Sequence, residues 1–367
     1  MRAAVLTATG APVEIEELRD PAPRAGEVLV EVTTCGVCHT DLHVMKGEVA
    51  FPLPAVLGHE VSGVVAEVGA GVRRVRAGDR VVASFIMPCG YCSRCVRGQE
   101  DLCETFFAMN RLKGTLYDGE TRLFRPDGSP VSMYSMGGLA ERCVVPETDV
   151  FAVPDSLRLE DVAILGCSSL TAYGALRNAA DLRVGDTVAI VATGGVGSSL
   201  VQLSAAFGAS DIIAIDISEE KLDAAANLGA THTVNSRVAD PVEAVRAITA
   251  GRGVDVAFEV LGSAATFATA ASVVADGGRV VVVGIAPAGV AGEIDLSRLP
   301  RRQLKVLGSY GGRPRTDMPA LLSLVERGVL SPERVVSRRF GLDQAAEAYQ
   351  ALARGEIVGR AVVDVVR

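Results

Sequence analysis

The sequence predicts an α/β protein of two domains, a β-rich domain followed by one in which strands and helices alternate. Three observations support this fold class. The chain has 367 residues, which is about the length of two domains. Short apolar runs broken by Gly and Pro fill roughly the first 165 residues, as in β-rich domains. From about residue 185, strand-like runs alternate with helical patterns, which indicates crossover connections and a parallel sheet.

The β-rich part contains short strands with Gly and Pro at their joins. The clearest strand-like runs are Met1–Leu6, Glu27–Val32, Val61–Val68 and Asp79–Ala83. Residues 104–137 are less regular, and the turn signals Asp118-Gly119 and Pro126-Asp127-Gly128 fall within them. We expect this stretch to be a long surface excursion.

The second part is predicted to form a doubly wound nucleotide-binding fold, because its strands divide into two halves with helices between them. The predicted strands are Thr187–Ala192, Asp211–Asp216, Ala230–Val234, Val254–Val260, Arg279–Ile285 and Leu304–Tyr310. Helices are expected near Gly197–Phe207 and Glu219–Leu228. The last segment, Thr316–Arg367, is predicted to hold one or two helices and a final strand, Gly359–Val366.

Composition excludes several classes of protein. Apolar residues make up 49% of the chain, which argues against disorder, yet no apolar run reaches the ~18 residues that span a bilayer. The net charge of −8 argues against nucleic acid and anionic membranes as partners. No leader-like apolar stretch follows Met1. We therefore expect a soluble cytoplasmic protein.

Four cysteines lie close together at Cys89, Cys92, Cys95 and Cys103. Thiolates at such spacings bind zinc as a closed tetrahedral cage, so the segment predicts a structural zinc lobe. Disulfides are the first alternative, although they need an oxidising compartment. An iron–sulfur cluster is the second, but bacterial ferredoxins place their fourth cysteine closer and before Pro. Buried free cysteines are the third.

A glycine-rich turn, Ala192-Thr193-Gly194-Gly195-Val196-Gly197, links a predicted strand to a helix. Gly194 would allow close approach of a pyrophosphate and Gly197 close packing of the helix, although Ala192 replaces the first glycine of the pattern. The next strand ends at Asp216, where an acidic residue accepts from ribose hydroxyls and repels a 2′-phosphate. This predicts NAD rather than NADP. The alternative for Asp216 is a helix N-cap.

Further cysteine and histidine residues occur in the β-rich half, in Cys35–His43, Gly58-His59-Glu60 and Leu165–Ser169. Each alone is weak, because a single cysteine or histidine is most often a core residue. Together they supply the ligands of an open catalytic zinc. Three of the four histidines fall within 21 positions, His39–His59.

These motifs together resemble the zinc-containing medium-chain alcohol dehydrogenases. The resemblance covers nearly the whole chain, through G-V-C-H-T-D, G-H-E, the four-cysteine lobe, G-C-S-S-L-T-A-Y-G, G-G-V-G and V-G-R. It implies a β-rich GroES-like catalytic domain (1–168), a Rossmann NAD-binding domain (169–309) and a return to the catalytic domain (310–367). It also implies two zinc ions per chain, one catalytic and one structural.

The resemblance implies roles for individual residues. Cys38, His59 and Cys167 match the catalytic zinc ligands, and Glu60 matches an acidic neighbour of the metal. Asp41 matches the carboxylate that orients the ligand histidine, while Thr40 and His43 match a proton relay. Cofactor contacts are implied for His39, Thr171, Gly194, Gly195, Val196, Gly197, Asp216, Lys221, Val283 and Arg360. Phe85 matches a wall of the substrate pocket, and Cys35 is interpreted as structural.

The resemblance implies reversible hydride transfer between an alcohol and NAD, and we favour primary or aromatic alcohols. The excursion at 104–137 matches a longer subtype that includes vertebrate-type enzymes and glutathione-dependent formaldehyde dehydrogenases. The latter hold the glutathione carboxylate with an arginine, whose position here is occupied by Ala108, with Arg111 nearby. A non-catalytic redox sensor using Cys35 or Cys38 is a further alternative. A homodimer is expected through residues 285–310, with a tetramer as the lesser possibility.

Overall fold

The computed structural model describes residues 1–365 and divides into two compact units. The first unit comprises Met1–Leu170, Arg313–Arg327 and Val336–Arg367, and the second comprises Thr171–Gly312 and Gly328–Val335. Val366 and Arg367, which end the last predicted strand and segment, lie outside the described residues. No helix within residues 1–365 is long and apolar enough to span a bilayer.

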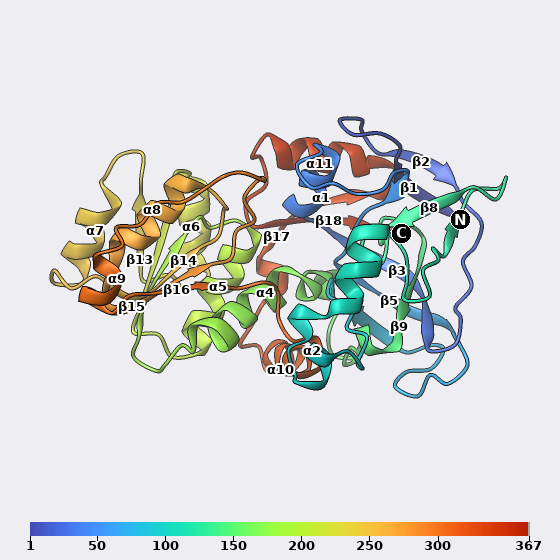
Figure 1. Ribbon diagram of the computed structural model, residues 1–367, viewed down its shortest axis with the longest axis horizontal. Helices are drawn as coiled ribbons and strands as arrows, with labels where there is room; N and C mark the ends of the chain where they lie inside the picture. The colour runs from blue at the N-terminus through green and yellow to red at the C-terminus, as the bar shows by residue number, and fades with distance from the viewer. Residues whose placement is uncertain (366–367) are drawn as a thin grey trace. The chain divides into compact units, whose positions relative to one another are not determined.

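The first unit is built on β-sheets (Figure 1). One sheet has the strand order β2-β1-β4-β8-β7. Its strands are β1 (Arg2–Leu6), β2 (Glu14–Glu17), β4 (Ala55–Val56), β7 (Leu123–Phe124) and β8 (Pro130–Met133). The other has the order β10-β6-β5-β3-β18-β17, and β9 also pairs with β3. Its strands are β3 (Glu27–Val37), β5 (Val61–Val68), β6 (Arg80–Ala83), β9 (Arg142–Pro146), β10 (Val150–Ala152), β17 (Val336–Gly341) and β18 (Arg360–Asp364).

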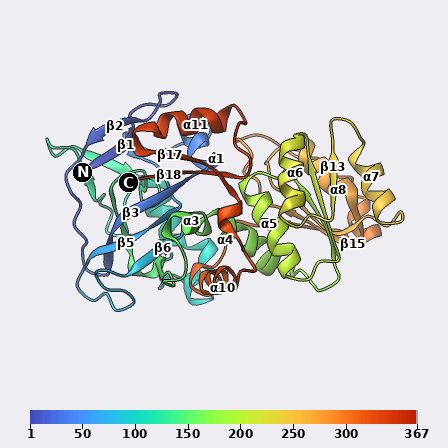
Figure 2. The same cartoon turned by 180° about the vertical axis from the view of Figure 1, so that it is seen from behind.

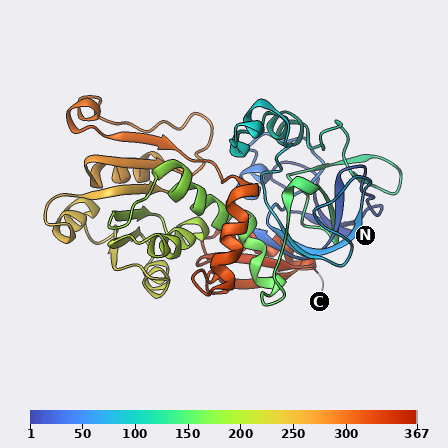
Figure 3. The same cartoon turned by 90° about the horizontal axis from the view of Figure 1, so that it is seen from below.

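The pairing of β18 with β3 is antiparallel and places Val363 opposite Cys35. The C-terminal strand therefore lies beside the first cysteine-containing motif. Seen from below, α10 (Pro314–Glu326) lies beside η4 (Ala163–Gly166) (Figure 3). Pro314 occupies the first turn of α10, where its missing N–H has no intrahelical partner to lose. The remaining helices of this unit are α1 (His39–Met45), α2 (Ser93–Val96), η1 (Glu100–Leu102), η2 (Phe106–Arg111), η3 (Glu147–Asp149), α3 (Leu159–Val162), η7 (Leu342–Gln344) and α11 (Ala345–Ala353).

The second unit is a parallel sheet with the strand order β13-β12-β11-β14-β15-β16, which is the doubly wound order. Its strands are β11 (Thr187–Val191), β12 (Asp211–Asp216), β13 (His232–Asn235), β14 (Val254–Glu259), β15 (Val274–Val282) and β16 (Lys305–Gly308). Every residue of β11 is buried, as expected of a central strand covered on both faces. Each fully buried Val or Ile contributes roughly 1.5–3 kcal/mol to folding.

Helices cover both faces of this sheet. Figures 1 and 2, which view the unit from opposite sides, place α5 (Gly195–Ala206) and α6 (Glu219–Asn227) over one face. They place α7 (Pro241–Ile248) and α8 (Ala264–Val273) over the other. α4 (Ser168–Gly174) joins the two units in sequence, and η5 (Ala175–Ala180), α9 (Arg298–Arg302) and η6 (Pro332–Arg334) complete the second.

The secondary structure departs from the sequence prediction at several places, among them β15, β17 and the excursion at 104–137. β15 begins at Val274 and ends at Val282, because Asp276-Gly277-Gly278, which resembles a turn, continues the strand. β17 was not predicted. Two adjacent arginines stand in its middle, so its sequence lacks the apolar run of a strand, although its residues alternate in burial. The excursion at 104–137 is more ordered than expected, because it contains η2 and the β7–β8 hairpin.

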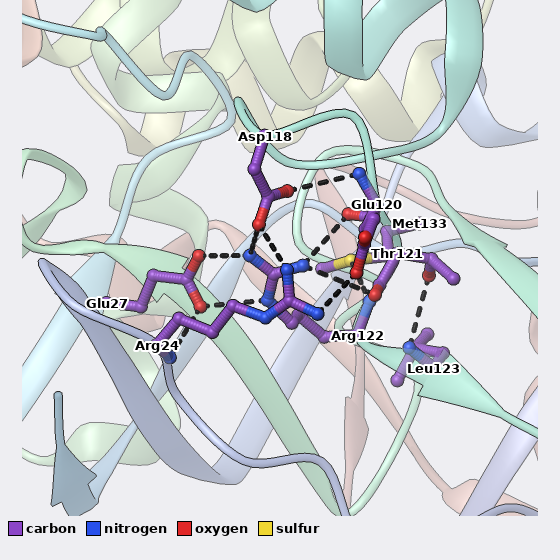
Figure 4. Close-up of polar contacts among 8 residues, drawn as sticks. All are labelled: Arg24, Glu27, Asp118, Glu120, Thr121, Arg122, Leu123 and Met133. Atoms are coloured by element: carbon purple, nitrogen blue, oxygen red, sulfur yellow. Dashed lines mark hydrogen bonds and ion pairs between the residues drawn. The ribbon is translucent and has the colours of Figure 1, made fainter.

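A buried arginine fixes the excursion to the start of β3. Figure 4 shows the guanidinium of Arg122 between the carboxylates of Glu27 and Asp118. Its Nε donates to Glu27 at 2.9 Å, one Nη donates to Asp118 at 2.6 Å, and the other Nη donates to the backbone carbonyls of Glu120 and Thr121. Arg24 adds a more exposed pair to Asp118, at 2.6 Å. The Nη that donates to Asp118 also donates to Glu27, so all five guanidinium N–H donors of Arg122 are engaged.

Candidate metal and dinucleotide sites

The four-cysteine lobe of the first unit has the geometry of a zinc cage. The ligand atoms of Cys89, Cys92, Cys95 and Cys103 all lie within 4.8 Å of one another. The Sγ atoms of Cys89 and Cys95 are 4.0 Å apart, and those of Cys92 and Cys103 are 3.9 Å apart. Zn–S bonds of about 2.3 Å in a tetrahedron require S···S distances of about 3.8 Å, whereas a disulfide requires about 2.05 Å. The donor set fits zinc, and all eight cysteines are free.

Backbone amides prepare the lobe for a cation. The amide of Cys89 donates to the Sγ of Cys103, and the amide of Cys92 donates to the Sγ of Cys89, both at 3.3 Å. Burial opposes ionisation of Cys92, but hydrogen bonds from the amides of Cys95 and Glu104 lower the pKa of its thiol to about 6. Amide donors stabilise a thiolate, which is the form that binds zinc.

A second ligand cluster lies in the same unit and is fully buried. Cys38 precedes α1, His59 and Glu60 precede β5, and Cys167 lies between η4 and α4. The ligand atoms of these four residues lie within 4.8 Å of one another. Two thiols, an imidazole and a carboxylate fit a zinc site with three ligands and a coordination position for substrate. The structure thus brings together residues from three separate motifs.

Charges within this cluster stabilise the thiolate of Cys38. A hydrogen bond from Cys167 and the positive charges of Arg360 and His59 hold the pKa of the Cys38 thiol well below its usual range. Burial disfavours the charged form of His59, but Asp41 and Cys38 outweigh it and raise the pKa of His59 to about 10. Because zinc binds the neutral imidazole, metal binding must displace that proton, and affinity falls as the pH falls.

Glu60 is held behind the cluster by a buried ion pair with Arg360. The Nε of Arg360 donates to Glu60 at 3.2 Å, a second bond joins its Nη to the same carboxylate, and that Nη lies 3.8 Å from the Sγ of Cys167. Gly36 makes room for this arrangement, since a Cβ there would stand 2.0 Å from Glu60. A contact of Arg360 with the cofactor phosphates remains a prediction.

Asp41 and the predicted relay residues lie on α1. Asp41 is buried, and its Oδ1 accepts from the Nδ1 of His59 at 2.9 Å. The Oγ1 of Thr40 accepts from the Sγ of Cys38 at 3.5 Å. His43 is half-buried, and its Nδ1 contacts the carboxylate of Glu48, whose pKa is lowered by that hydrogen bond. His39, the first residue of α1, is exposed.

Aromatic side chains form a wall beside His59. Phe85 and Tyr134 meet the imidazole edge to face, with ring centroids 6.0 and 5.9 Å away. The guanidinium of Arg111 stacks over Tyr134 at 4.2 Å and lies 5.8 Å from the ring of Phe85. Phe85 was predicted as a pocket wall, but Tyr134 was not. The position of Arg111 depends on the course of η2, which the sequence did not predict.

Cys35 is buried against Gly58. A Cβ on Gly58 would stand 2.7 Å from the Sγ of Cys35.

The glycine-rich turn of the second unit has the features of a pyrophosphate cradle. A Cβ on Gly197 would stand 2.3 Å from the carbonyl of Ala192, whereas a Cβ on Gly194 would point into open space that a ligand can fill. α5 begins at Gly195 with no side chain capping its amides. Ala192 has φ of +79°, a left-handed conformation that costs roughly 1–3 kcal/mol for a non-glycine residue. These features fit a dinucleotide.

Asp216 at the end of β12 fixes this turn. It is 7% exposed, and its Oδ2 accepts from the amide and hydroxyl of Thr193 at 2.8 and 3.1 Å. Its Oδ1 accepts from the amides of Ile217 and Ser218 at 2.7 and 3.1 Å. The carboxylate therefore joins two turns, a structural role that the sequence suggested only as a helix cap. The predicted ring-packing residues Thr171 and Val283 are buried in this unit, and Lys221 on α6 is half-buried.

The first unit thus carries two metal-ligand clusters and the second a dinucleotide turn, which together define a zinc-dependent oxidoreductase that uses a nicotinamide cofactor. Two family profiles match the chain. The alcohol dehydrogenase GroES-like domain matches residues 24–155, and the zinc-binding dehydrogenase matches residues 195–327.

Named relatives agree with these profiles. The chain is 36% identical to an NDMA-dependent alcohol dehydrogenase of Amycolatopsis methanolica, covering 97% of this chain and 96% of that protein. It is 34% identical to an S-(hydroxymethyl)glutathione dehydrogenase of Escherichia coli, covering 97% and 98%. The benzyl alcohol dehydrogenase structure from Acinetobacter calcoaceticus has a TM-score of 0.93 at 31% identity, covering 100% and 99%. A zinc-binding dehydrogenase structure from Sinorhizobium meliloti, bound to NADP, has a TM-score of 0.84 at 29% identity, covering 99% of each chain.

The chain belongs to the zinc-containing medium-chain alcohol dehydrogenase family.

Proposed function

We propose that this enzyme interconverts primary or aromatic alcohols and their aldehydes, with NAD as hydride acceptor. The observation that carries the proposal is the buried cluster of Cys38, His59 and Cys167 beside the aromatic wall of Phe85 and Tyr134. Apolar walls with a few polar groups suit an alcohol with an apolar body. The likeness to a benzyl alcohol dehydrogenase supports the aromatic part of this range.

The proposed chemistry divides between the metal and the protein. Cys38, His59 and Cys167 would hold a zinc ion, which would supply Lewis acidity and bring the pKa of an alcohol down toward neutral. Asp41 keeps the Nε2 of His59 turned toward the thiols, because the Nδ1 is engaged. Burial of the cluster excludes water from the reacting carbon. The proton would leave through the hydroxyl of Thr40, the ribose hydroxyls of the cofactor and the imidazole of His43.

An activity panel tests the proposal directly. Alcohols and aldehydes of increasing size are assayed with NAD and with NADP, with and without glutathione. We expect turnover of primary or aromatic alcohols without glutathione, and no turnover of any alcohol would contradict the proposal.

The second candidate, glutathione-dependent formaldehyde oxidation, is favoured by the Escherichia coli relative and by the cation of Arg111, which stacks on Tyr134 beside His59. Activity on formaldehyde only with glutathione would select it.

We expect His43→Gln to slow alcohol oxidation about ten- to a hundredfold near neutral pH, because a relay base contributes roughly 10²–10⁴-fold and water can replace part of it at a half-buried site. The difference should shrink at high pH, where hydroxide accepts the proton. Small imidazole bases should partly restore the rate of the variant. pH–rate profiles of both proteins check this, and superimposable profiles would remove His43 from the proton path.

We expect Asp216→Gly to raise the ratio of NADP to NAD efficiency by about tenfold or more. A carboxylate about 4 Å from a 2′-phosphate repels it by about 4 kcal/mol at an effective dielectric of 20. For NADP, losing this repulsion outweighs losing the hydrogen bonds that Asp216 would accept from the ribose. The variant also loses its bonds to Thr193 and should melt at a lower temperature. Steady-state kinetics with both cofactors check the ratio, and a wild-type preference for NADP would refute the assignment.

We propose a cytoplasmic homodimer, with a homotetramer as the lesser possibility. β16 forms an edge of the cofactor-binding sheet, and its Val306 is 42% exposed. Leu296, in the segment before β16, is 73% exposed. An apolar strand edge of this kind favours pairing with a second copy.

A non-catalytic redox sensor is less well supported, because Cys35 is buried and Cys38 belongs to the ligand cluster.

A further inference from the structure

Tyr349 is a fully buried residue of α11 that contacts the metal cluster indirectly. Its side chain is 1% exposed, and its hydroxyl donates to the Oδ2 of Asp41 at 2.9 Å. The two residues are 308 positions apart in the sequence. Both lie in the first unit, where α1 and α11 pack together. Nothing in the proposed reaction uses the phenol itself.

The hydroxyl completes the hydrogen bonding of a buried carboxylate. Asp41 is 0% exposed, and its Oδ1 accepts from His59 at 2.9 Å and from the amide of Gly58 at 3.2 Å. Its Oδ2 accepts from Tyr349. Burial and the charge of Asp41 raise the pKa of Tyr349 well above its ordinary value, so the phenol keeps its proton and remains a donor.

We propose that Tyr349 is a positioning residue of the catalytic metal centre, acting through Asp41 on His59. The carboxylate can rotate about its Cα–Cβ and Cβ–Cγ bonds unless both oxygens are held. With the phenol on Oδ2, the Oδ1 stays aimed at the Nδ1 of His59, and the Nε2 of that ring stays aimed at the two thiols. Partners of a ligand histidine set ring orientation and ligand basicity.

The alternative is that Tyr349 only fills the core. The two roles differ in what the hydroxyl does, because Phe has the same ring and lacks only that oxygen. Without the hydroxyl, one oxygen of a buried carboxylate loses its donor, which is unfavourable where water cannot replace it. The carboxylate can recover by rotating, which takes its other oxygen away from His59. A core role predicts a change in stability alone, whereas a positioning role predicts weaker metal binding.

Zinc release by Tyr349→Phe tests the inference without measuring turnover. The zinc-loaded full-length protein is mixed with a chromogenic chelator, and release is followed over time. Zinc release should show two kinetic phases, one for each site. The phase that is absent from the Cys38→Ser variant belongs to the catalytic site. We expect Tyr349→Phe to speed this phase by up to about 10-fold, because loss of a direct partner of a ligand histidine costs about 10–100-fold and Tyr349 acts one contact further out. The four-cysteine phase should stay unchanged. Binding of Co²⁺ at the catalytic site, followed by its visible spectrum, should weaken to match.

Tyr117→Phe is a matched control. Its hydroxyl donates to the carbonyl of Met87 and has no link to Asp41. We expect it to lower stability without changing catalytic zinc release. Equal release rates for Tyr349→Phe and the wild type would overturn the inference, even if the variant melts at a lower temperature. The inference concerns the metal centre of the proposed reaction, yet it stands separately: faster release together with an inactive substrate panel would remove the proposed reaction and retain the role of Tyr349.

Discussion

Cys38→Ser is expected to reduce alcohol oxidation at least about a thousandfold while leaving the fold largely intact. A metal acting as a Lewis acid supplies several kcal/mol at the reacting oxygen, and about 4 kcal/mol corresponds to a thousandfold in rate. Serine keeps the size of the side chain but cannot replace a thiolate as a zinc ligand. The zinc content should fall from about two to about one ion per chain. Metal analysis and single-substrate kinetics check both numbers.

Two further cysteine variants serve as controls for this expectation. Cys35→Ser makes the same change three positions earlier in the sequence, at a buried thiol that donates to the carbonyl of Gly36 and lies outside both ligand clusters. It should keep both zinc ions and most of the activity. Cys92→Ser opens the four-cysteine cage, so it should lower the melting temperature while the other cluster keeps its ligands. Full activity in Cys38→Ser would refute the catalytic assignment.

Sequence patterns predicted the parts of this enzyme that depend on local spacing. The four cysteines of the lobe lie within one short segment, and the glycine-rich turn lies between a buried strand and a helix. The alternation of strands and helices predicted the parallel sheet, because each crossover leaves a short, continuous apolar run beside a helical pattern. Zinc and a nicotinamide cofactor followed from these local features and from the resemblance that they carry.

Residue spacing alone could not predict contacts between distant segments. Tyr349 reads as an ordinary aromatic residue of an amphipathic helix until α11 is placed against α1. The resemblance implied a cofactor contact for Arg360, but not the buried pair that its guanidinium forms with Glu60. The internal bonds of Asp216 depend on the conformation of Ala192 and Thr193, and an alanine at positive φ gives no signal in the sequence. Each of these contacts requires the tertiary fold first.

Arg122→Met is expected to reduce the free energy of unfolding by about 3–5 kcal/mol, the cost of removing one partner of a buried ion pair. The side chain of Arg122 is 4% exposed and that of Glu27 is 12% exposed, so the carboxylate of Glu27 would lose its charged partner where water scarcely reaches. The backbone carbonyls of Glu120 and Thr121 would lose their donors as well. Chemical denaturation of the zinc-loaded protein measures the change, and faster proteolysis near residues 112–124 should accompany it.

Arg24→Met separates burial from charge, because Arg24 contacts the same carboxylate of Asp118 at the same 2.6 Å distance. Its side chain is 49% exposed, so water replaces the lost pair and the cost should be a small fraction of that of Arg122→Met. The double variant Arg122→Met with Glu27→Leu removes both buried charges, and it should recover much of the loss, since an apolar pair in place of a buried ion pair is often neutral. Equal costs for Arg24→Met and Arg122→Met would show that the network in Figure 4 acts through surface charge rather than through a buried pair that holds the excursion on β3.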